Sequence, residues 1–412
     1  MLPEVSAVLS GYRPETRIDV ALLGSALFLQ RFSLPFGNTR LALDFVPTAF
    51  ILLHQFVSGK LVIQYDRLLW FIAVVLTASC SLVSNFERTS LTSVSQFLVL
   101  SSLFTLIRPS SPGCYKRTLQ AFQSLVMFLS SLAVAQFVAQ FVVNGMEIIM
   151  FFGMIPDVLN GGGAHTIHAI EGSSLLKSNG IFLAEPSNLT QVVALGILIE
   201  VLEFRRPRYL LVMVLGFLLA YSGAGMTTLL VLLPLASLRE GKVAQSVLLA
   251  GIFALGLFAT GIIDFSVFHS RSAEFEQVGS SGFGRFIGPY WSVTKFFDTA
   301  PLQAILVGYG PGAKSQLGDD WFVVGWFRQF YEYGIIGSFI FICFLLSCLR
   351  RSRCPKLVLA GAVFTYFLIA DSLSTWVSTI LIVLCTLHGP EPRHGRVARE
   401  PGTLPELALA DG

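Results

Sequence analysis

The sequence predicts an all-α, polytopic membrane protein with about 12 transmembrane helices and two long external loops. Only 13% of the 412 residues are charged, 54% are hydrophobic, and the mean hydropathy is +0.70. A soluble protein would carry about 25% charged residues. This deficit excludes a secreted or cytosolic globule, and the abundance of hydrophobic residues excludes a disordered chain. The net charge of +3 is too small to indicate a nucleic-acid partner.

The apolar residues fall into runs that are long enough to cross a bilayer, which takes roughly 20 residues. Lipid offers the backbone no hydrogen-bond partners, so such runs must be helices or barrel strands, and their continuity favours helices. The short runs within 209–238 and 357–387 are separated only by polar breaks and could each be a re-entrant pair. The expected spans are residues 18–35, 41–57, 68–84, 91–107, 119–143, 189–204, 209–222, 226–238, 243–263, 326–349, 357–370 and 373–387.

Lysine and arginine residues are distributed between the loops in a way that orients the chain. Most of the 28 basic residues fall in every second loop, which predicts that these loops and both termini are cytoplasmic. Arg31, Arg40 and Arg88 fall in short outer turns instead. The expected organisation is helices in 1–143, an external loop in 144–188, helices in 189–263, a large external loop with an amphipathic segment in 264–325, helices in 326–388 and a disordered cytoplasmic tail in 389–412.

The end of the first external loop contains an acidic candidate, Glu185. Pro186 follows it, with a serine and an asparagine next, which is typical of a helix start. Glu185 would therefore lie beside a positive helix end at the membrane edge, either to compensate the dipole or to meet a membrane-borne substrate. His165 and His168 lie in the same loop without a third ligand nearby, so no metal site is expected.

The second external loop is amphiphilic. Its stretch 285–297 is rich in aromatic residues and should present an apolar face to the membrane or the bundle. Arg285 and Lys295 lie in this stretch and Arg271 precedes it. Basic residues beside such a face could bind a lipid-linked diphosphate, or they could be the snorkelling cations of an ordinary interfacial helix.

Two further features follow along the chain. Residues 308–312 read Gly-Tyr-Gly-Pro-Gly, a poor nucleotide motif but a tight turn whose N–H groups, near Tyr309 and Gly310, could bind an anion. Arg328 and Glu332 are four residues apart, so they share a helix face and could pair. Charges at membrane depth cost about 2.5–3.5 kcal/mol each, so pairing with each other and contact with a substrate are both open.

In this order, the features resemble the O-antigen ligase and polymerase superfamily of bacterial envelope glycosyltransferases. The resemblance covers residues 180–345, and the N-terminal half matches only in being hydrophobic. The matching pieces are the segment 180–188 that enters a span, the Ser-Gly-Ala-Gly break at 222–225, Gly284-Arg285 with Trp291 downstream, Leu-Val-Gly-Tyr-Gly-Pro-Gly at 306–312 and Tyr-Glu-Tyr-Gly-Ile-Ile-Gly at 331–337.

The resemblance implies an enzyme of the bacterial inner membrane that polymerises undecaprenyl-diphosphate-linked oligosaccharide repeat units at the outer face. The reaction would be an inverting transfer to a sugar hydroxyl, without a nucleotide sugar, a metal or another cofactor. A ligase that moves finished glycan to a lipid or protein acceptor is the alternative within the same chemistry. A transporter or flippase is the alternative from another class, although charges at span ends favour surface chemistry. Chain-length regulator and flippase proteins are candidate partners.

The resemblance also assigns residues. Arg285 is the first candidate to neutralise the diphosphate, and Arg328 and Arg271 are weaker candidates for the same role. Developing charge on the leaving group needs positioned cations of this kind. The remaining candidates for substrate binding are Lys295, Tyr309, Gly310 and Glu332.

A proton acceptor is harder to assign. Many ligase members have a histidine just before the tenth span, but the equivalent stretch 318–321 reads Gly-Asp-Asp-Trp. The absence of this histidine counts against a ligase. The attacking hydroxyl still needs a base within hydrogen-bond reach, so Glu185 is the first candidate and Asp319 or Asp320 the next.

Overall fold

The computed structural model describes residues 14–36, 39–109, 113–142, 156, 158–159, 176–240, 276, 278, 283–318, 321–369 and 374–389. Within these residues 13 α-helices confirm the all-α class. Two small antiparallel sheets were not expected. One pairs β1 with β2 and the other pairs β3 with β4. The strands are β1 Ser33–Phe36, β2 Thr39–Ala42, β3 Val62–Ile63 and β4 Leu106–Ile107.

Every expected span except 243–263, which lies outside the described residues, overlaps a helix. The α-helices are α2 Pro14–Phe28, α3 Phe45–Val57, α4 Tyr65–Ser84, α5 Leu91–Leu103, α6 Cys114–Ala139, α8 Pro186–Ile199, α9 Pro207–Leu219, α10 Gly223–Glu240, α13 Gly288–Thr299, α14 Leu302–Val307, α15 Gly325–Leu349, α16 Lys356–Phe364 and α17 Thr375–Leu381. Short 3₁₀ or π segments are η1 Phe86–Arg88, η2 Glu200–Phe204, η3 Phe283–Ile287, η4 Ala313–Gln316, η5 Thr365–Ile369 and η6 Ile382–Thr386.

Four of these helical stretches are long and apolar enough to cross a membrane: α4, α6, α8 together with η2, and α15. The number of spans expected from the sequence is therefore not shown. The first two expected spans are shorter than predicted, because α2 ends at Phe28 and the chain then forms the β1–β2 hairpin before α3. β1 contains Leu34, Pro35 and Phe36, so the hydropathy of the run does not distinguish strand from helix.

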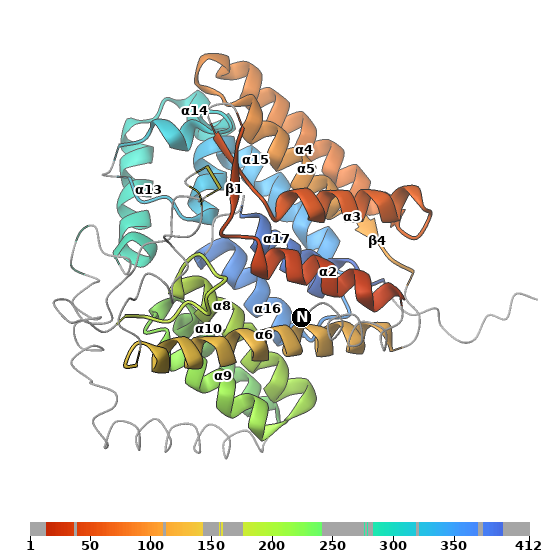
Figure 1. Ribbon diagram of the computed structural model, residues 1–412. Helices are drawn as coiled ribbons and strands as arrows, with labels where there is room; N and C mark the ends of the chain where they lie inside the picture. Colours follow the sequence, from red (N-terminus) through yellow and green to blue (C-terminus); the bar gives the residue numbers. More distant parts are fainter. Residues whose placement is uncertain are drawn as a thin grey trace, which may run out of the picture.

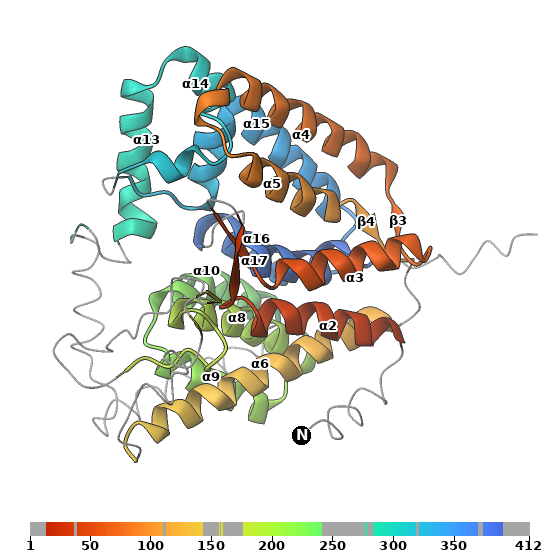
Figure 2. The same ribbon diagram turned by 45° about the horizontal axis from the view of Figure 1, so that its top comes forward.

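The helices form two groups (Figures 1 and 2). In one group α4 packs against α15 and α5, and in the other α8 packs against α10 and α9, and α6 against α9. Two connections join the groups. α2 contacts α6 and α3, and α3 contacts α5; α16 contacts α8, and η5, which directly follows α16, contacts α15. The most apolar window of the α8 span is 78% buried, whereas that of α4 is only 22% buried. Thus α8 is central and α4 presents most of its surface to the surroundings.

The Ser-Gly-Ala-Gly break at 222–225 separates α9 from α10 and lets α10 approach α8. A Cβ atom at Gly225 would collide with the carbonyl group of Thr190. The Gly225 N–H instead donates to the Thr190 hydroxyl at 3.1 Å. A glycine is therefore needed here because two helix backbones come into direct contact.

One end of the bundle, which we call the inner end, gathers helix ends around Arg67. Its Nη1 donates to the carbonyl oxygens of Phe104 and Leu106 at 3.0 and 3.1 Å. Its Nη2 donates to those of Cys348 and Thr386 at 2.9 and 3.0 Å. Helix C-terminal carbonyls lack partners and carry partial negative charge. The fully buried Arg67 thus closes the ends of α5, α15 and η6.

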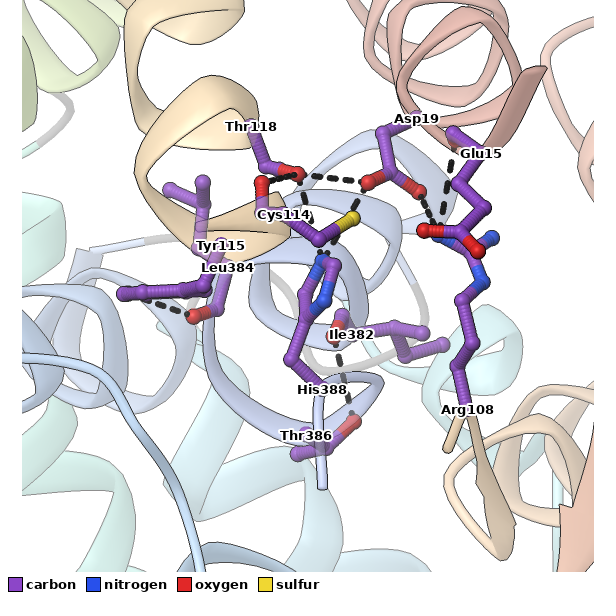
Figure 3. Close-up of polar contacts among 10 residues, drawn as sticks. All are labelled: Glu15, Asp19, Arg108, Cys114, Tyr115, Thr118, Ile382, Leu384, Thr386 and His388. Carbon is purple, nitrogen blue, oxygen red and sulfur yellow. Dashed lines mark hydrogen bonds and ion pairs between the residues drawn. The ribbon is translucent and has the colours of Figure 1, made fainter. Parts of the chain in front are cut away.

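The inner end also joins the two ends of the described chain (Figure 3). Asp19 of α2 forms an ion pair with Arg108, whose Nη1 lies 2.6 Å from Oδ1. Its Oδ2 accepts a hydrogen bond from the Thr118 hydroxyl at 2.6 Å and lies 3.2 Å from His388 Nε2. Asp19, Cys114 and His388 could offer ligands to a metal. However, the carboxylate is already occupied by a guanidinium and a hydroxyl, so its surroundings favour a structural cluster over a metal site.

Candidate functional site

The opposite end of the bundle, which we call the outer end, contains a break in α15. Gly334 has φ 68° and ψ −172° and divides the helix into two segments. Gly308, just after α14, also has positive φ, at 81°. A Cβ atom at Gly308 would collide with the backbone of Glu332, and one at Gly334 with the backbone of Leu306. The end of α14 therefore packs directly on the break, which only glycine permits at both positions.

The Gly-Tyr-Gly-Pro-Gly turn at 308–312 is bound to this break through its N–H groups. Tyr309 N donates to the Tyr331 carbonyl at 2.9 Å, and Gly310 N donates to the Glu332 carbonyl at 3.1 Å. These N–H groups are thus used within the protein. The expectation that they could bind an anion is wrong for these two positions, because the sequence could not show that a broken helix would use them.

Helix α4 supports the same junction from its outer end. The Ser81 hydroxyl donates to the Glu332 carbonyl at 2.8 Å, and Asn85 Nδ2 donates to the Gly308 carbonyl at 3.1 Å. Since Arg67 binds α15 at the inner end, these contacts fix α4 and α15 as antiparallel neighbours. The end of α4 and the 308–312 turn therefore lie together at the outer end of the bundle. The distribution of basic residues predicts that both are external.

Arg328 and Glu332 form an ion pair, one of the two possibilities that their spacing left open. Arg328 Nε lies 3.1 Å from Glu332 Oε1, and the side chains are 14% and 1% exposed. Taking two charges out of water is costly unless both are well coordinated. Here each charge has the other as its partner. Glu332 is held both by its backbone carbonyl, which accepts a hydrogen bond from the 308–312 turn, and by its carboxylate, which pairs with Arg328.

Helix α13 lies beside α15 (Figure 2). Aromatic side chains of α13 and of the first segment of α15 pack in one hydrophobic cluster. Phe296 is fully buried and its ring contacts Tyr309 and Tyr331 at centroid distances of 5.7 Å each. Tyr290 and Trp291 are 69% and 59% exposed. The expectation of an apolar face against the bundle is thus confirmed, and the exposed aromatic rings are typical of a membrane interface.

The predicted cations of the second external loop can be placed only in part. Lys295 lies on α13, half-buried, with Nζ 4.7 Å from the centre of the Trp321 ring. This is a cation–π contact. The backbone of Arg285 lies in η3, directly before α13. Arg271, Asp319 and Asp320 lie outside the described residues.

An apolar groove of about 270 Å³ runs between α13, α15 and η5, and we call it the α13–α15 groove. Two of its polar atoms are buried and have no hydrogen-bond partner, namely Gln329 Nε2 and Ser338 Oγ. Neither residue was predicted from the sequence. The lining residues are Val293, Phe297, Trp326, Gln329, Phe330, Ser338, Ile342 and Phe367.

Glu185 begins α8, as the sequence predicted. Pro186 is its first helical residue, and the Ser187 hydroxyl donates to Glu185 Oε2 at 2.7 Å. Asn188 Nδ2 donates to Gln30 Oε1 at 2.8 Å, so this helix start is joined to the end of α2. The half-buried Glu185 thus lies where α8 meets the start of the β1–β2 hairpin.

A buried carboxyl group that the sequence analysis missed lies in the same hairpin. Asp44, in the turn between β2 and α3, is 1% exposed, and neither carboxylate oxygen accepts a hydrogen bond. Burial raises its pKa to about 7. The backbone N–H groups of Asp44 and Phe45 lower the pKa, but by less. The Leu43 N–H donates to the Phe32 carbonyl at 2.8 Å. The antiparallel pairing of β1 with β2 therefore continues beyond the ends of the two strands. In this register the next pair of opposite residues is Arg31 and Asp44.

Arg31 is also buried, at 3% exposure, and its Nη1 donates to the Ile181 carbonyl at 3.1 Å. Burial lowers its pKa to about 10, so it remains a cation at neutral pH. The signal for Asp44 was present, because an acidic residue inside the apolar run 41–57 is expensive and usually functional. Hydropathy alone predicts one continuous span over 41–57, whereas Asp44 lies between β2 and the start of α3.

The described residues form a bundle of apolar helices, four of which are long and apolar enough to cross a membrane. This architecture defines a membrane protein. Residues 20–305 match the family model of the WcaD colanic acid polymerase. The match covers more than half of the chain, so the chain belongs to the WcaD colanic acid polymerase family, a family of Wzy-type polysaccharide polymerases. Comparisons with curated proteins and with solved structures found no match.

Membership of this family establishes the activity. The protein is a membrane glycosyltransferase of the inner membrane that polymerises lipid-linked repeat units into exopolysaccharide. Of the three functions that the sequence left open, the family selects polymerisation. The match also begins at residue 20, so the expectation that the N-terminal half resembles the superfamily only in hydrophobicity is wrong. Helix α15, with Arg328 and Glu332, lies beyond the matched residues.

Proposed function

We propose that the outer end of the bundle carries out the transfer, with undecaprenyl diphosphate as the lipid carrier and inversion at the reacting sugar carbon. One observation carries this proposal. The largely buried Arg328–Glu332 pair lies on α15, the helix that also lines the α13–α15 groove, at a helix break that the 308–312 turn fixes in place. A cation on a helix that also lines an apolar groove suits a substrate with a diphosphate joined to a hydrocarbon chain.

In this mechanism the acceptor hydroxyl attacks the anomeric carbon of the donor repeat. The new carbon–oxygen bond forms while the bond from that carbon to the diphosphate oxygen breaks, and the electron pair leaves with the diphosphate. Cations must stabilise the charge that develops there. We assign this role to Arg285 first, because it directly precedes the amphipathic helix α13, and to Arg328 and Arg271 next. Lys295, Tyr309, Gly310 and Glu332 would hold or shape the binding site.

The proton of the attacking hydroxyl goes to a carboxylate. Glu185 is the first candidate because it lies at the positive start of α8 and is only half-buried. Asp319 and Asp320 are the next candidates.

The proposed orientation places the outer end in the periplasmic leaflet and both termini in the cytoplasm. Support comes from the inner end, where Asp19 and His388 meet near the two ends of the described chain. The basic loops predict that this end is cytoplasmic. Chain-length regulator and flippase proteins remain proposed partners, because the substrate must reach the outer leaflet before it is polymerised.

The test is an in vivo complementation assay with the Arg285→Ala variant. We expect long polymer to disappear while single lipid-linked repeats accumulate, because substrate still arrives and only transfer fails. Arg351→Ala is the matched control, since Arg351 is exposed at the inner end and pairs only loosely with Asp66, at 3.5 Å. Polymer of wild-type length in the Arg285→Ala strain contradicts the assignment. A reconstituted assay that identifies the acceptor then checks that repeats, and no other lipid or protein, receive the glycan.

A further inference from the structure

The chain makes a strained turn shortly before Glu185. Gly180 and Ile181 both have φ 69°, and the Phe182 N–H donates to the Gly180 carbonyl at 2.8 Å. A hydrogen bond that closes three residues around a central residue of positive φ defines the rare and strained form of the γ-turn. Ile181, at its centre, is β-branched, so this backbone conformation is especially unfavourable for it.

Hydrogen bonds hold the turn from several directions. Asn179 Oδ1 accepts from the Ile181 N–H at 3.0 Å, and Asn179 Nδ2 donates to the Leu183 carbonyl at 2.9 Å. Arg31 Nη1 donates to the Ile181 carbonyl at 3.1 Å. Gln136 of α6 supports Asn179, because its Oε1 accepts from the Asn179 N–H and its Nε2 donates to Asn179 Oδ1, both at 3.0 Å. A strained backbone persists only where its surroundings fix it in this way.

The same contacts fix the position of Glu185. Glu185 is the N-cap residue of α8, and Leu183, just before it, is fully buried. On the other side, Asn188 Nδ2 donates to Gln30 Oε1 at 2.8 Å, and Gln30 directly precedes Arg31. The end of α2 therefore holds the chain on both sides of Glu185, through Arg31 before it and Gln30 after it.

We propose that Asn179 and Arg31 are positioning residues, which hold the turn at Ile181 so that the Glu185 carboxylate stays where it can take the proton of the acceptor hydroxyl. This inference rests on the function proposed above, in which Glu185 is the first candidate for the proton acceptor. Strained backbone is concentrated at functional sites, where it contributes to preorganisation. Asn179 and Arg31 act on the transfer through Glu185 and do not contact the substrate.

The first test measures the kinetics of full-length protein in vesicles, with the lipid-linked repeat unit as substrate. We expect Asn179→Ala to lower kcat by about 10- to 100-fold and to leave KM nearly unchanged, because a displacement of about 1 Å in a reacting group has an effect of this size. The control is Gln140→Ala, which removes a hydrogen bond to the Leu176 N–H, ahead of the turn. It should lower the Tm and leave kcat unchanged. A wild-type kcat in Asn179→Ala overturns the proposal.

A double-variant cycle shows whether the effect passes through Glu185. Glu185→Gln keeps the shape of the side chain and removes the base, so adding Asn179→Ala to it should lower kcat no further. An equal further loss in that background overturns the positioning role, since a merely structural defect would act in both backgrounds. A wild-type kcat in Glu185→Gln alone contradicts the proposed proton acceptor, and the positioning role falls with it. The two failures are therefore distinguishable.

Arg31 is tested by its conservative variant. Arg31→Met should lower kcat, and Arg31→Lys should restore most of it, because lysine keeps a donor and a charge that can reach the Ile181 carbonyl. A raised KM with an unchanged kcat in Arg31→Met would show a contact with the anionic substrate itself and overturns the positioning role of Arg31.

A last test separates the backbone of the turn from the Ile181 side chain. Glycine adopts positive φ freely, so Ile181→Gly keeps the turn and should keep kcat. Proline is fixed at a φ of about −65° and has no N–H, so Ile181→Pro removes the turn and its bond to Asn179, and should lower kcat as Asn179→Ala does. An equal loss of kcat in both variants would assign the effect to the side chain and overturns the role of the turn.

Discussion

Gly308 and Gly334 pack against each other's neighbouring backbone, so that the end of α14 and the break in α15 form one rigid junction. This contact joins two consecutive helices directly, backbone against backbone. Through it, the turn at 308–312 fixes the carbonyl groups of Tyr331 and Glu332. The placement of the Arg328–Glu332 pair and the shape of the α13–α15 groove both depend on this junction.

Gly308→Ala and Gly334→Ala should therefore damage both stability and polymerisation. Each adds a Cβ that collides with backbone atoms, at a positive φ that alanine adopts poorly. We expect a loss of at least about 1–3 kcal/mol of stability and shorter polymer. Thermal unfolding of the purified protein in detergent measures the first effect, and polymer length in cells the second. Gly223→Ala is the control, because no atom lies within 4 Å of its added Cβ.

The Arg328–Glu332 pair can be separated into structural and functional parts. Arg328→Met alone leaves a buried carboxylate without its cation, which should cost about 3–5 kcal/mol. The double variant Arg328→Met, Glu332→Leu should recover most of this stability, because no uncompensated charge remains. We expect the double variant to fold and yet to make no polymer, since the cation proposed to meet the diphosphate is gone. A stable double variant with normal polymer would show that the pair is structural.

Arg67 should not tolerate a lysine. Its guanidinium binds four carbonyl groups, and a single ammonium cannot reach all of them. The loss of two or more charged hydrogen bonds, at about 1.5–3 kcal/mol each, should lower the Tm markedly. The KM of the remaining folded protein should be unchanged, because Arg67 lies at the inner end. Arg351→Lys, at an exposed position of the same end, should have little effect on either quantity.

Asp44 predicts a particular dependence of stability on pH. Its pKa is about 7 in the folded protein and about 3.9 in an unfolded chain. The folded state thus binds an extra proton between these values, so the contribution to stability is fully present below about pH 4 and is lost as the pH rises through 7. Asp44→Asn should raise the Tm relative to wild type at pH 8 and change it less at pH 5. An exposed control, Asp298→Asn, should show no such difference between the two pH values, and an equal shift of the Asp44 variant at both would contradict the account.

Local patterns in the sequence predicted the local features. The spacing of Arg328 and Glu332 allowed their pairing, and Pro186 predicted the start of α8. Most apolar runs marked helices, and the aromatic residues of 285–297 marked a helix with one face on the bundle. Each of these features depends on residues within a few turns of one another, so a single sequence contains the signal.

The features that the sequence could not show depend on contacts between distant segments. The N–H groups of the 308–312 turn are used by α15, and the α13–α15 groove exists only because α13, α15 and η5 come together. The β1–β2 hairpin was hidden because its strands are as apolar as the helices beside them. The position of Asp44 could not be predicted for the same reason, although a charged residue inside an apolar run already indicated an unusual site.

The cluster at the inner end has a consequence for how the protein is made. Asp19 and Arg108 are synthesised well before His388. Because chains emerge from the N-terminus onward, the first described helix enters the membrane long before its last polar partner exists. The segment that contains His388 can therefore bind the start of the bundle only after the helices between them have been synthesised.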